Sequence, residues 1–167
     1  MPSRCAPAEP QTTGPVAAVD AARRVVVLGI GNTILSDEGV GVHALAALQQ
    51  DFELPPGTEV IDGGTAGMEL LDALTDVDLL LVFDAVKAGR APGSLVCLEG
   101  DEVPVFFRHK LSPHQVGIGD VLASLRFAGN GPRDLVLVGV EPAVLDLGLS
   151  LSAAVAAGLP RMIAAAA

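Results

Sequence analysis

One short stretch constrains the fold of this chain more than any other part of the sequence. Residues 25–28 are consecutive apolar residues that run into Gly29-Ile30-Gly31-Asn32, and the adjacent carboxylates Asp37 and Glu38 follow a few residues later. A helical pattern begins directly after these acids. A buried strand that breaks at glycines and is followed by acids is typical of the edge where open α/β sheets place their sites. The stretch therefore predicts such a sheet, with its site at the carboxyl ends of the strands.

The rest of the sequence predicts one α/β domain over residues 23–167, preceded by a disordered tail, residues 1–22, that is rich in Ala, Pro and Thr. Strands are expected at 24–29, 58–61, 78–83, 94–99 and 134–138, with helices after residue 38, near 68–74, from 113 and at 152–163. Residues 85–93 are too few for a parallel crossover, so the fourth strand is expected to run antiparallel to the third through a hairpin-type connection. The predicted fold class is a three-layer α/β domain with a twisted, mostly parallel sheet of about five strands, one of them antiparallel, and helices on both faces.

Helical spacing also predicts which side chains point inward. The expected buried residues are Val42, Leu45, Leu48 and Phe52 in the first helix, Met68, Leu71 and Leu74 in the second, and Ile118, Val121, Leu122 and Leu125 in the third. The third helix should begin at a capping box, in which Ser112 caps the helix and Gln115 reaches back to it.

Charge and hydropathy narrow the classes of partner. The formal net charge is −10, which argues against nucleic acid and against an anionic membrane surface because both would repel the chain at long range. No apolar run approaches the roughly 20 residues of a membrane-spanning helix, and the first residues lack the apolar core of a signal peptide. A soluble, cytoplasmic protein is therefore expected.

Acids follow three of the predicted parallel strands. Glu38 follows the first, Asp84 ends the third and Glu141 follows the fifth, so their positions share one edge of the sheet. His114, in the first turn of its helix, can join them from the connection after the fourth strand. Two carboxylates and an imidazole suit Ni²⁺, Zn²⁺ or a similar ion, and three protein ligands leave coordination positions open. Glu38, Asp84 and His114 are therefore the predicted catalytic and metal-contacting residues.

Each of these residues also has a structural interpretation. Glu38 can interact favourably with the helix dipole as an acid in the first turn. Asp84 can cap the loop after its strand, and His114 can be a surface residue of a capped helix. Asp37 is expected to act at the helix start. Asp62 is expected to organise the Gly63-Gly64 turn through its side-chain oxygen.

A nucleotide site is the second alternative. Gly29 and Gly31 before a helix begin like a dinucleotide fingerprint, but Ile34 occupies the position of the third glycine. The next strand also lacks an acid at the usual spacing of about 20 residues. This alternative assigns no role to His114.

Five segments in order resemble the maturation endopeptidases of NiFe (nickel–iron) hydrogenases, most closely the branch that serves membrane-bound or uptake-type enzymes. The segments are distributed over about residues 23–163 and are Val27–Asn32 with Ser36–Gly41, Asp62–Leu71, Asp84-Ala85 with Ala91–Gly93, Lys110–Gly117 and Leu137–Pro142. One such motif would be weak evidence, but five in the same order are specific.

The resemblance implies an endopeptidase that removes a C-terminal extension from the hydrogenase large-subunit precursor after nickel insertion. It implies that the family's metal-contacting residues fall on Glu38, Asp84 and His114. We expect nickel to be carried by the precursor and to serve recognition rather than to be permanently bound by the protease. The alternatives are that the metal polarises the carbonyl or activates a water, or that one carboxylate acts as the general base on a water. The family is sometimes classed with aspartic-type peptidases, and a monomer is expected. The alternative function for a chain with this resemblance is a nickel-dependent chaperone or proofreading protein that docks on the same precursor without cutting it.

Overall fold

A computed structural model describes residues 23–108 and 113–166. Its centre is a five-stranded sheet in the order β2-β1-β3-β5-β4. The strands are β1 (Val25–Ile30), β2 (Thr58–Gly64), β3 (Leu79–Ala85), β4 (Leu95–Glu99) and β5 (Asp134–Val140). All neighbouring pairs are parallel except β4 and β5. The predicted fold class is confirmed.

One detail of the predicted topology is wrong. The antiparallel strand β4 pairs with β5, and β5 in turn lies between β3 and β4, so β3 and β4 form no hairpin. The physical reason is that β3 and β5 are both mostly buried apolar strands, and each needs a paired strand on both sides. The shorter β4 is only partly buried, as suits a strand at the edge of the sheet.

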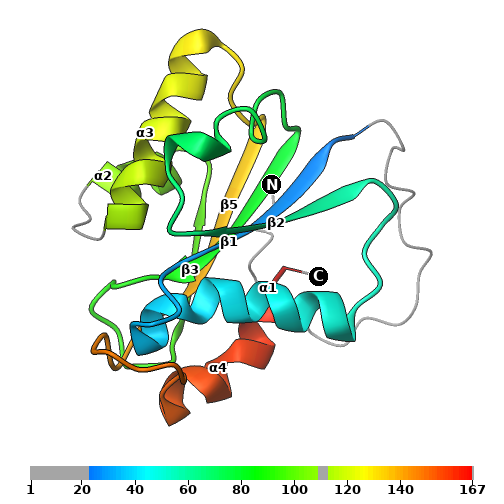
Figure 1. The fold of residues 1–167 in the computed structure, drawn as a ribbon. Helices are drawn as coiled ribbons and strands as arrows, with labels where there is room; N and C mark the ends of the chain where they lie inside the picture. The colour runs from blue at the N-terminus through cyan, green and yellow to red at the C-terminus, as the bar shows by residue number, and fades with distance from the viewer. Residues whose placement is uncertain (1–22, 109–112, 167) are drawn as a thin grey trace.

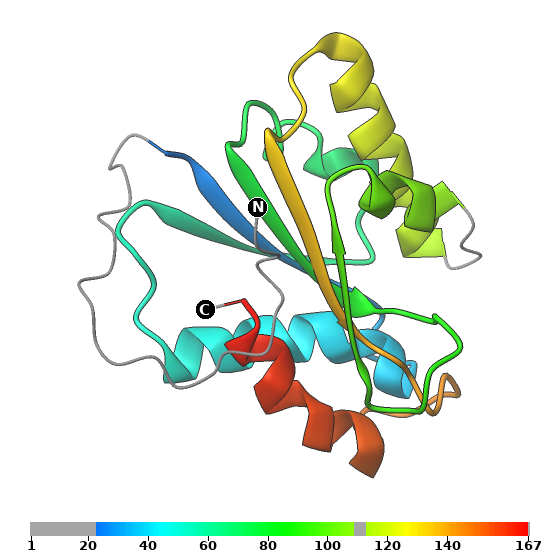
Figure 2. The same cartoon turned by 180° about the vertical axis from the view of Figure 1, so that it is seen from behind.

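Helices cover both faces of the sheet, as Figures 1 and 2 show from opposite sides. The helical elements are η1 (Ser36–Gly39), α1 (Val40–Asp51), η2 (Met68–Leu70), α2 (Glu102–Arg108), α3 (Pro113–Ala128) and α4 (Ala153–Ala164). Helices α1 and α4 lie on one face, and α2 and α3 lie on the other. Side chains of β3 alternate between the two cores: Leu80 and Val82 pack on the α3 side, and Leu81 and Phe83 pack on the α1 side. No helix within the described residues combines the length and the apolar character that crossing a bilayer requires.

The predicted inward faces are confirmed for α3 and only partly for the first two helical segments. All four residues expected to be buried in α3 are buried. In α1 the buried stripe is Val40, Ala44, Leu45 and Leu48, whereas Phe52 lies beyond the helix end and is exposed. Met68 is also exposed, because residues 68–70 form a single 3-10 turn to which the 3.6-residue period does not apply. The predicted cap Ser112 and the predicted tail 1–22 lie outside the described residues.

Two glycines allow α1 to approach the ends of β1 and β3. A Cβ atom on Gly41 would lie 2.2 Å from the Phe83 carbonyl oxygen and 2.3 Å from that of Ile30. Gly31 has a φ of +136°, and a Cβ atom there would lie 1.9 Å from the carbonyl oxygen of Glu38. Both positions require glycine because the chain packs against its own backbone. The glycines of the opening stretch therefore have a structural role, which is to bring Glu38 to the end of β1.

Candidate active site

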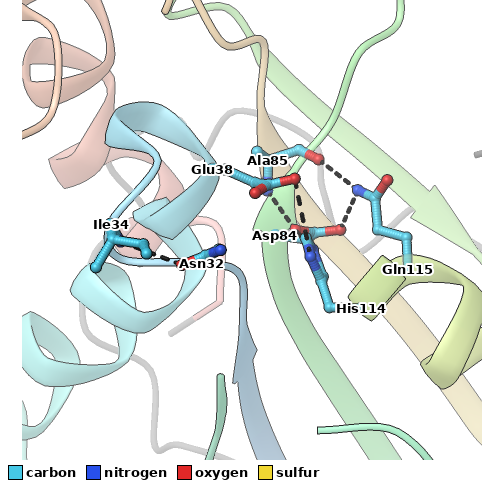
Figure 3. Close-up of polar contacts among 7 residues, drawn as sticks. All are labelled: Asn32, Ile34, Glu38, Asp84, Ala85, His114 and Gln115. Atoms are coloured by element: carbon cyan, nitrogen blue, oxygen red, sulfur yellow. Dashed lines mark hydrogen bonds and ion pairs between the residues drawn. The ribbon is translucent and has the colours of Figure 1, made fainter. Parts of the chain in front are cut away.

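The structure brings the three predicted site residues together at the carboxyl ends of the strands (Figure 3). Glu38 lies in η1, the first helical element after β1, Asp84 lies near the end of β3, and His114 is the second residue of α3. The imidazole stands between the two carboxylates: its Nε2 is 3.2 Å from Asp84 Oδ1, and its Nδ1 is 3.9 Å from Glu38 Oε1. Three segments that are remote in sequence thus converge on one imidazole.

Asp84 is completely buried and is held by three groups. Its Oδ1 accepts a hydrogen bond from its neighbour Ala85 N at 2.7 Å and faces His114, while its Oδ2 accepts one from Gln115 Nε2, also at 2.7 Å. Burial raises the pKa of Asp84 because the charged form loses water, although the bonds from His114, Gln115 and Ala85 act in the opposite direction. The site therefore holds a carboxyl group that takes up a proton more readily than an ordinary aspartate.

Gln115 is a site residue that the sequence analysis missed, because it assigned this side chain to a capping box. In the structure its amide nitrogen donates to Asp84 Oδ2 and, at 3.1 Å, to the Ala85 carbonyl oxygen. Both amide hydrogens are thereby used, which fixes the orientation of the amide and of the carboxylate that it binds. Its position directly after His114 was a possible signal, but its contact with β3 follows only from the way α3 meets the sheet.

Glu38 is the accessible member of the group. Its side chain is 14 % exposed, whereas those of His114 and Asp84 are 1 % and 0 % exposed. A neutral imidazole carries one N–H, so it donates to one carboxylate and offers a lone pair toward the other. The arrangement can therefore move a proton between a buried and an accessible acid, or present oxygen and nitrogen ligands to a cation that arrives from the Glu38 side.

Asp37 has a larger structural role than the predicted one at the helix start. Its Oδ2 accepts hydrogen bonds from Ala143 N at 2.9 Å, Val144 N at 2.8 Å and Ser152 Oγ at 2.8 Å, and its Oδ1 accepts one from Ser152 N at 2.7 Å. Burial alone would raise its pKa, but the four hydrogen bonds outweigh burial and hold the pKa of Asp37 below the usual value. This carboxylate fixes the loop between β5 and α4.

Two other acids at this edge do not join Glu38, Asp84 and His114. Glu141 is buried, and its carboxylate accepts hydrogen bonds from three successive amides: Ala88 at 2.7 Å, Gly89 at 3.3 Å and Arg90 at 3.1 Å. It holds the loop that leaves β3. Asp62 Oδ1 accepts a hydrogen bond from Gly64 N at 3.0 Å, so its predicted role in the turn is confirmed.

The expected metal contact remains a prediction. Within residues 23–108 and 113–166, no group of three or more His, Cys, Asp or Glu side chains has the arrangement of a metal site. The ligand types at Glu38, Asp84 and His114 suit nickel, but each ring nitrogen of His114 faces a carboxylate in the structure. A cation bound by His114 would have to replace one of these contacts between a ring nitrogen and a carboxylate.

Comparisons with known proteins agree on one family. The family described as hydrogenase maturation protease matches residues 42–167, a span that includes Asp84 and His114 and begins just after Glu38. The hydrogenase 2 maturation protease of Escherichia coli is 47 % identical over 135 residues, which are 80 % of this chain and 82 % of that protein. The hydrogenase expression/formation protein HupM of Azotobacter chroococcum is 46 % identical over 144 residues, covering 85 % and 69 % of the two chains. The solved structure of the hydrogenase-maturating endopeptidase HybD from E. coli superposes with a TM-score of 0.82 at 44 % identity, covering 84 % of this chain and 88 % of that one.

Proposed function

This chain belongs to the hydrogenase maturation proteases and is a hydrolase, and on that premise we propose that it removes the C-terminal extension of a NiFe hydrogenase large-subunit precursor after nickel has been inserted. The observation that carries the proposal is the convergence of Glu38, Asp84 and His114 at one edge of the sheet. We further propose that the protein acts as a monomer in the cytoplasm.

Nickel in this proposal belongs to the substrate and serves recognition. Glu38 is the side chain that a precursor-bound nickel ion can reach from solvent, and the buried His114 and Asp84 lie behind it. Oxygen and imidazole ligands from the protease would complete the coordination of an ion that the precursor already holds. Such contacts would fix the adjacent peptide bond in place, and orientation of this kind can supply a large part of a rate enhancement.

Water activation is assigned to the same carboxylates. A carboxylate within hydrogen-bond reach of a water can act as its general base, and the imidazole between two acids can then move the proton away. Glu38 is the better placed of the two acids for contact with water because Asp84 is fully enclosed. A carboxylate acting on water is the chemistry of aspartic-type peptidases, which supports that classification.

The test is a mass measurement on purified precursor, incubated with the protein with and without nickel. The proposal predicts loss of a C-terminal peptide from the nickel-loaded precursor only. Intact nickel-loaded precursor after prolonged incubation would contradict cleavage and favour the non-cutting chaperone. Equal cleavage of the nickel-free precursor would contradict recognition through nickel.

A further inference from the structure

Exposed apolar side chains gather on two segments beside Glu38. The exposed fraction is 52 % for Ile34, in the turn after β1, and between 40 and 81 % for four residues of the loop between β5 and α4. We call this set the leucine patch, and its members are Ile34, Val144, Leu145, Leu147 and Leu149. Single exposed apolar residues are ordinary, but a group of five on adjoining segments is typical of an interaction surface.

The two segments are bound to each other through their backbones. Gly148 N donates to the Ile34 carbonyl oxygen at 3.0 Å, and Ser36 N donates to the Gly148 carbonyl oxygen at 2.8 Å. Asp37 N donates to the Val144 carbonyl oxygen at 3.1 Å. The loop therefore follows the turn that leads to Glu38, and the leucine patch continues the surface next to the candidate active site.

Side-chain contacts hold the loop in this outward conformation. The Asp37 carboxylate accepts hydrogen bonds from the first and last residues of the segment 143–152, as described above. Ser36 Oγ donates to the Asp146 carbonyl oxygen at 2.9 Å, and Ser36 itself adopts a φ of +49°, which non-glycine residues rarely adopt. A conformation of this kind persists only where surrounding contacts impose it, and such conformations gather at functional sites. The fold thus fixes apolar side chains in solvent, although their burial would be favourable.

We propose that the leucine patch is a docking surface for an apolar part of the hydrogenase large-subunit precursor, next to the bond that is cut. This inference rests on the proposed function for the identity of the partner. Backbone hydrogen bonds join the loop of the patch to the segment that carries Glu38. This proximity favours the substrate as the occupant of the patch, because a molecule that reaches Glu38 also reaches the patch. A second copy of the chain is a poorer occupant: the patch exposes on the order of 500 Å², whereas a stable dimer buries about 800 Å² on each partner.

The experiment compares a double variant of the patch with a matched control. Leu147→Ser with Leu149→Ser removes the two most exposed leucines of the patch. Phe127→Ser removes a side chain that is 96 % exposed at the C-terminal end of α3, and Figure 1 shows this end of α3 far from the loop between β5 and α4. KM and kcat are measured with nickel-loaded precursor, and the Kd for the precursor is measured with each change placed in a His114→Ala background that does not cut. Size-exclusion chromatography with light scattering reports the oligomeric state of each protein.

The double variant is expected to raise KM and Kd about tenfold or more, with little change in kcat, whereas Phe127→Ser leaves all three unchanged. An unchanged Kd in the double variant, or an equal loss in the Phe127 control, would overturn the docking surface. A wild-type dimer that the double variant converts to a monomer would overturn it as well. Cleavage by the wild type tests the proposed function separately. If the precursor binds through the patch but is never cut, the proposed function is wrong and the docking surface still stands.

Discussion

Asp37 and Asp84 are both fully buried at the same edge of the sheet, yet the groups around them differ in kind. Asp37 is surrounded by donors from a single loop, namely backbone amides and the hydroxyl of Ser152. Asp84 has one backbone donor, and its other partners are the titratable ring of His114 and the amide of Gln115. The pKa of Asp37 is lowered, while that of Asp84 is raised.

The comparison shows that burial alone does not distinguish a structural acid from a chemical one. A carboxylate whose lone pairs are taken up by fixed backbone donors is stabilised as an anion and has little capacity left for a substrate. A carboxylate that faces a titratable imidazole keeps such a capacity. Asp37 thus belongs to the framework, we propose that Asp84 takes part in the reaction, and the following changes test that division.

The largest effect is expected for Asp84→Asn. It removes the buried carboxylate while keeping its volume, so cleavage of the nickel-loaded precursor should fall by about 10³-fold or more, while circular dichroism shows a folded protein. Asp51→Asn, at an exposed acid at the end of α1, serves as the control and should cleave like the wild type. Near-normal cleavage by Asp84→Asn would remove Asp84 from the reaction.

The second effect concerns stability and should appear at Asp37. Asp37→Asn replaces a carboxylate that has four donors with an amide, whose NH₂ group must face an N–H or O–H donor. We expect the free energy of unfolding to fall by about 3 kcal/mol, because charged hydrogen bonds are lost and buried donors are left unpaired. Urea denaturation measures the change, and the Asp51→Asn control should lose less than about 0.5 kcal/mol. If Asp37→Asn were as stable as the control, the anchoring role would be wrong.

These two acids also show what the sequence can predict. Glu38, Asp84 and the parallel strands were predictable because apolar runs and the acids that follow them are local signals, and parallel strands bring such ends to one edge. The partners of Asp37 lie 106 to 115 residues further along the chain, and no local pattern points to them. The insertion of β5 between β3 and β4 is equally non-local, whereas the short connection between β3 and β4 is a local signal that predicts a hairpin.

A smaller effect is expected from Gln115→Met, which keeps the length of the side chain and removes its donor. Gln115 is buried and donates a hydrogen bond to Asp84, so we expect it to position Asp84. Loss of such a partner typically lowers activity by about 10- to 100-fold. Because the bond from Gln115 opposes the rise in the pKa of Asp84, its loss should also move the acid limb of the pH–kcat profile to higher pH. Gln50→Met, at an exposed position of α1, is the matched control. A fall in kcat with an unshifted profile would indicate a packing role only.

The smallest effect is the pH dependence of stability, and its sign differs between the two aspartates. The pKa of Asp37 is lower in the folded than in the unfolded chain, so its contribution to stability is present above the unfolded pKa and is lost as the pH falls through the folded pKa. The pKa of Asp84 is raised, so its contribution is complete below the unfolded pKa and is lost as the pH rises through the folded pKa. Urea denaturation of the wild type and both Asn variants between about pH 4 and pH 8 measures each difference in the free energy of unfolding.

The destabilisation by Asp37→Asn should shrink toward acid pH, whereas Asp84→Asn should gain stability relative to the wild type as the pH rises. The same pH trend in both variants would mean that the two carboxylates are not held in opposite ways, and the division between framework and reaction would lose its physical basis.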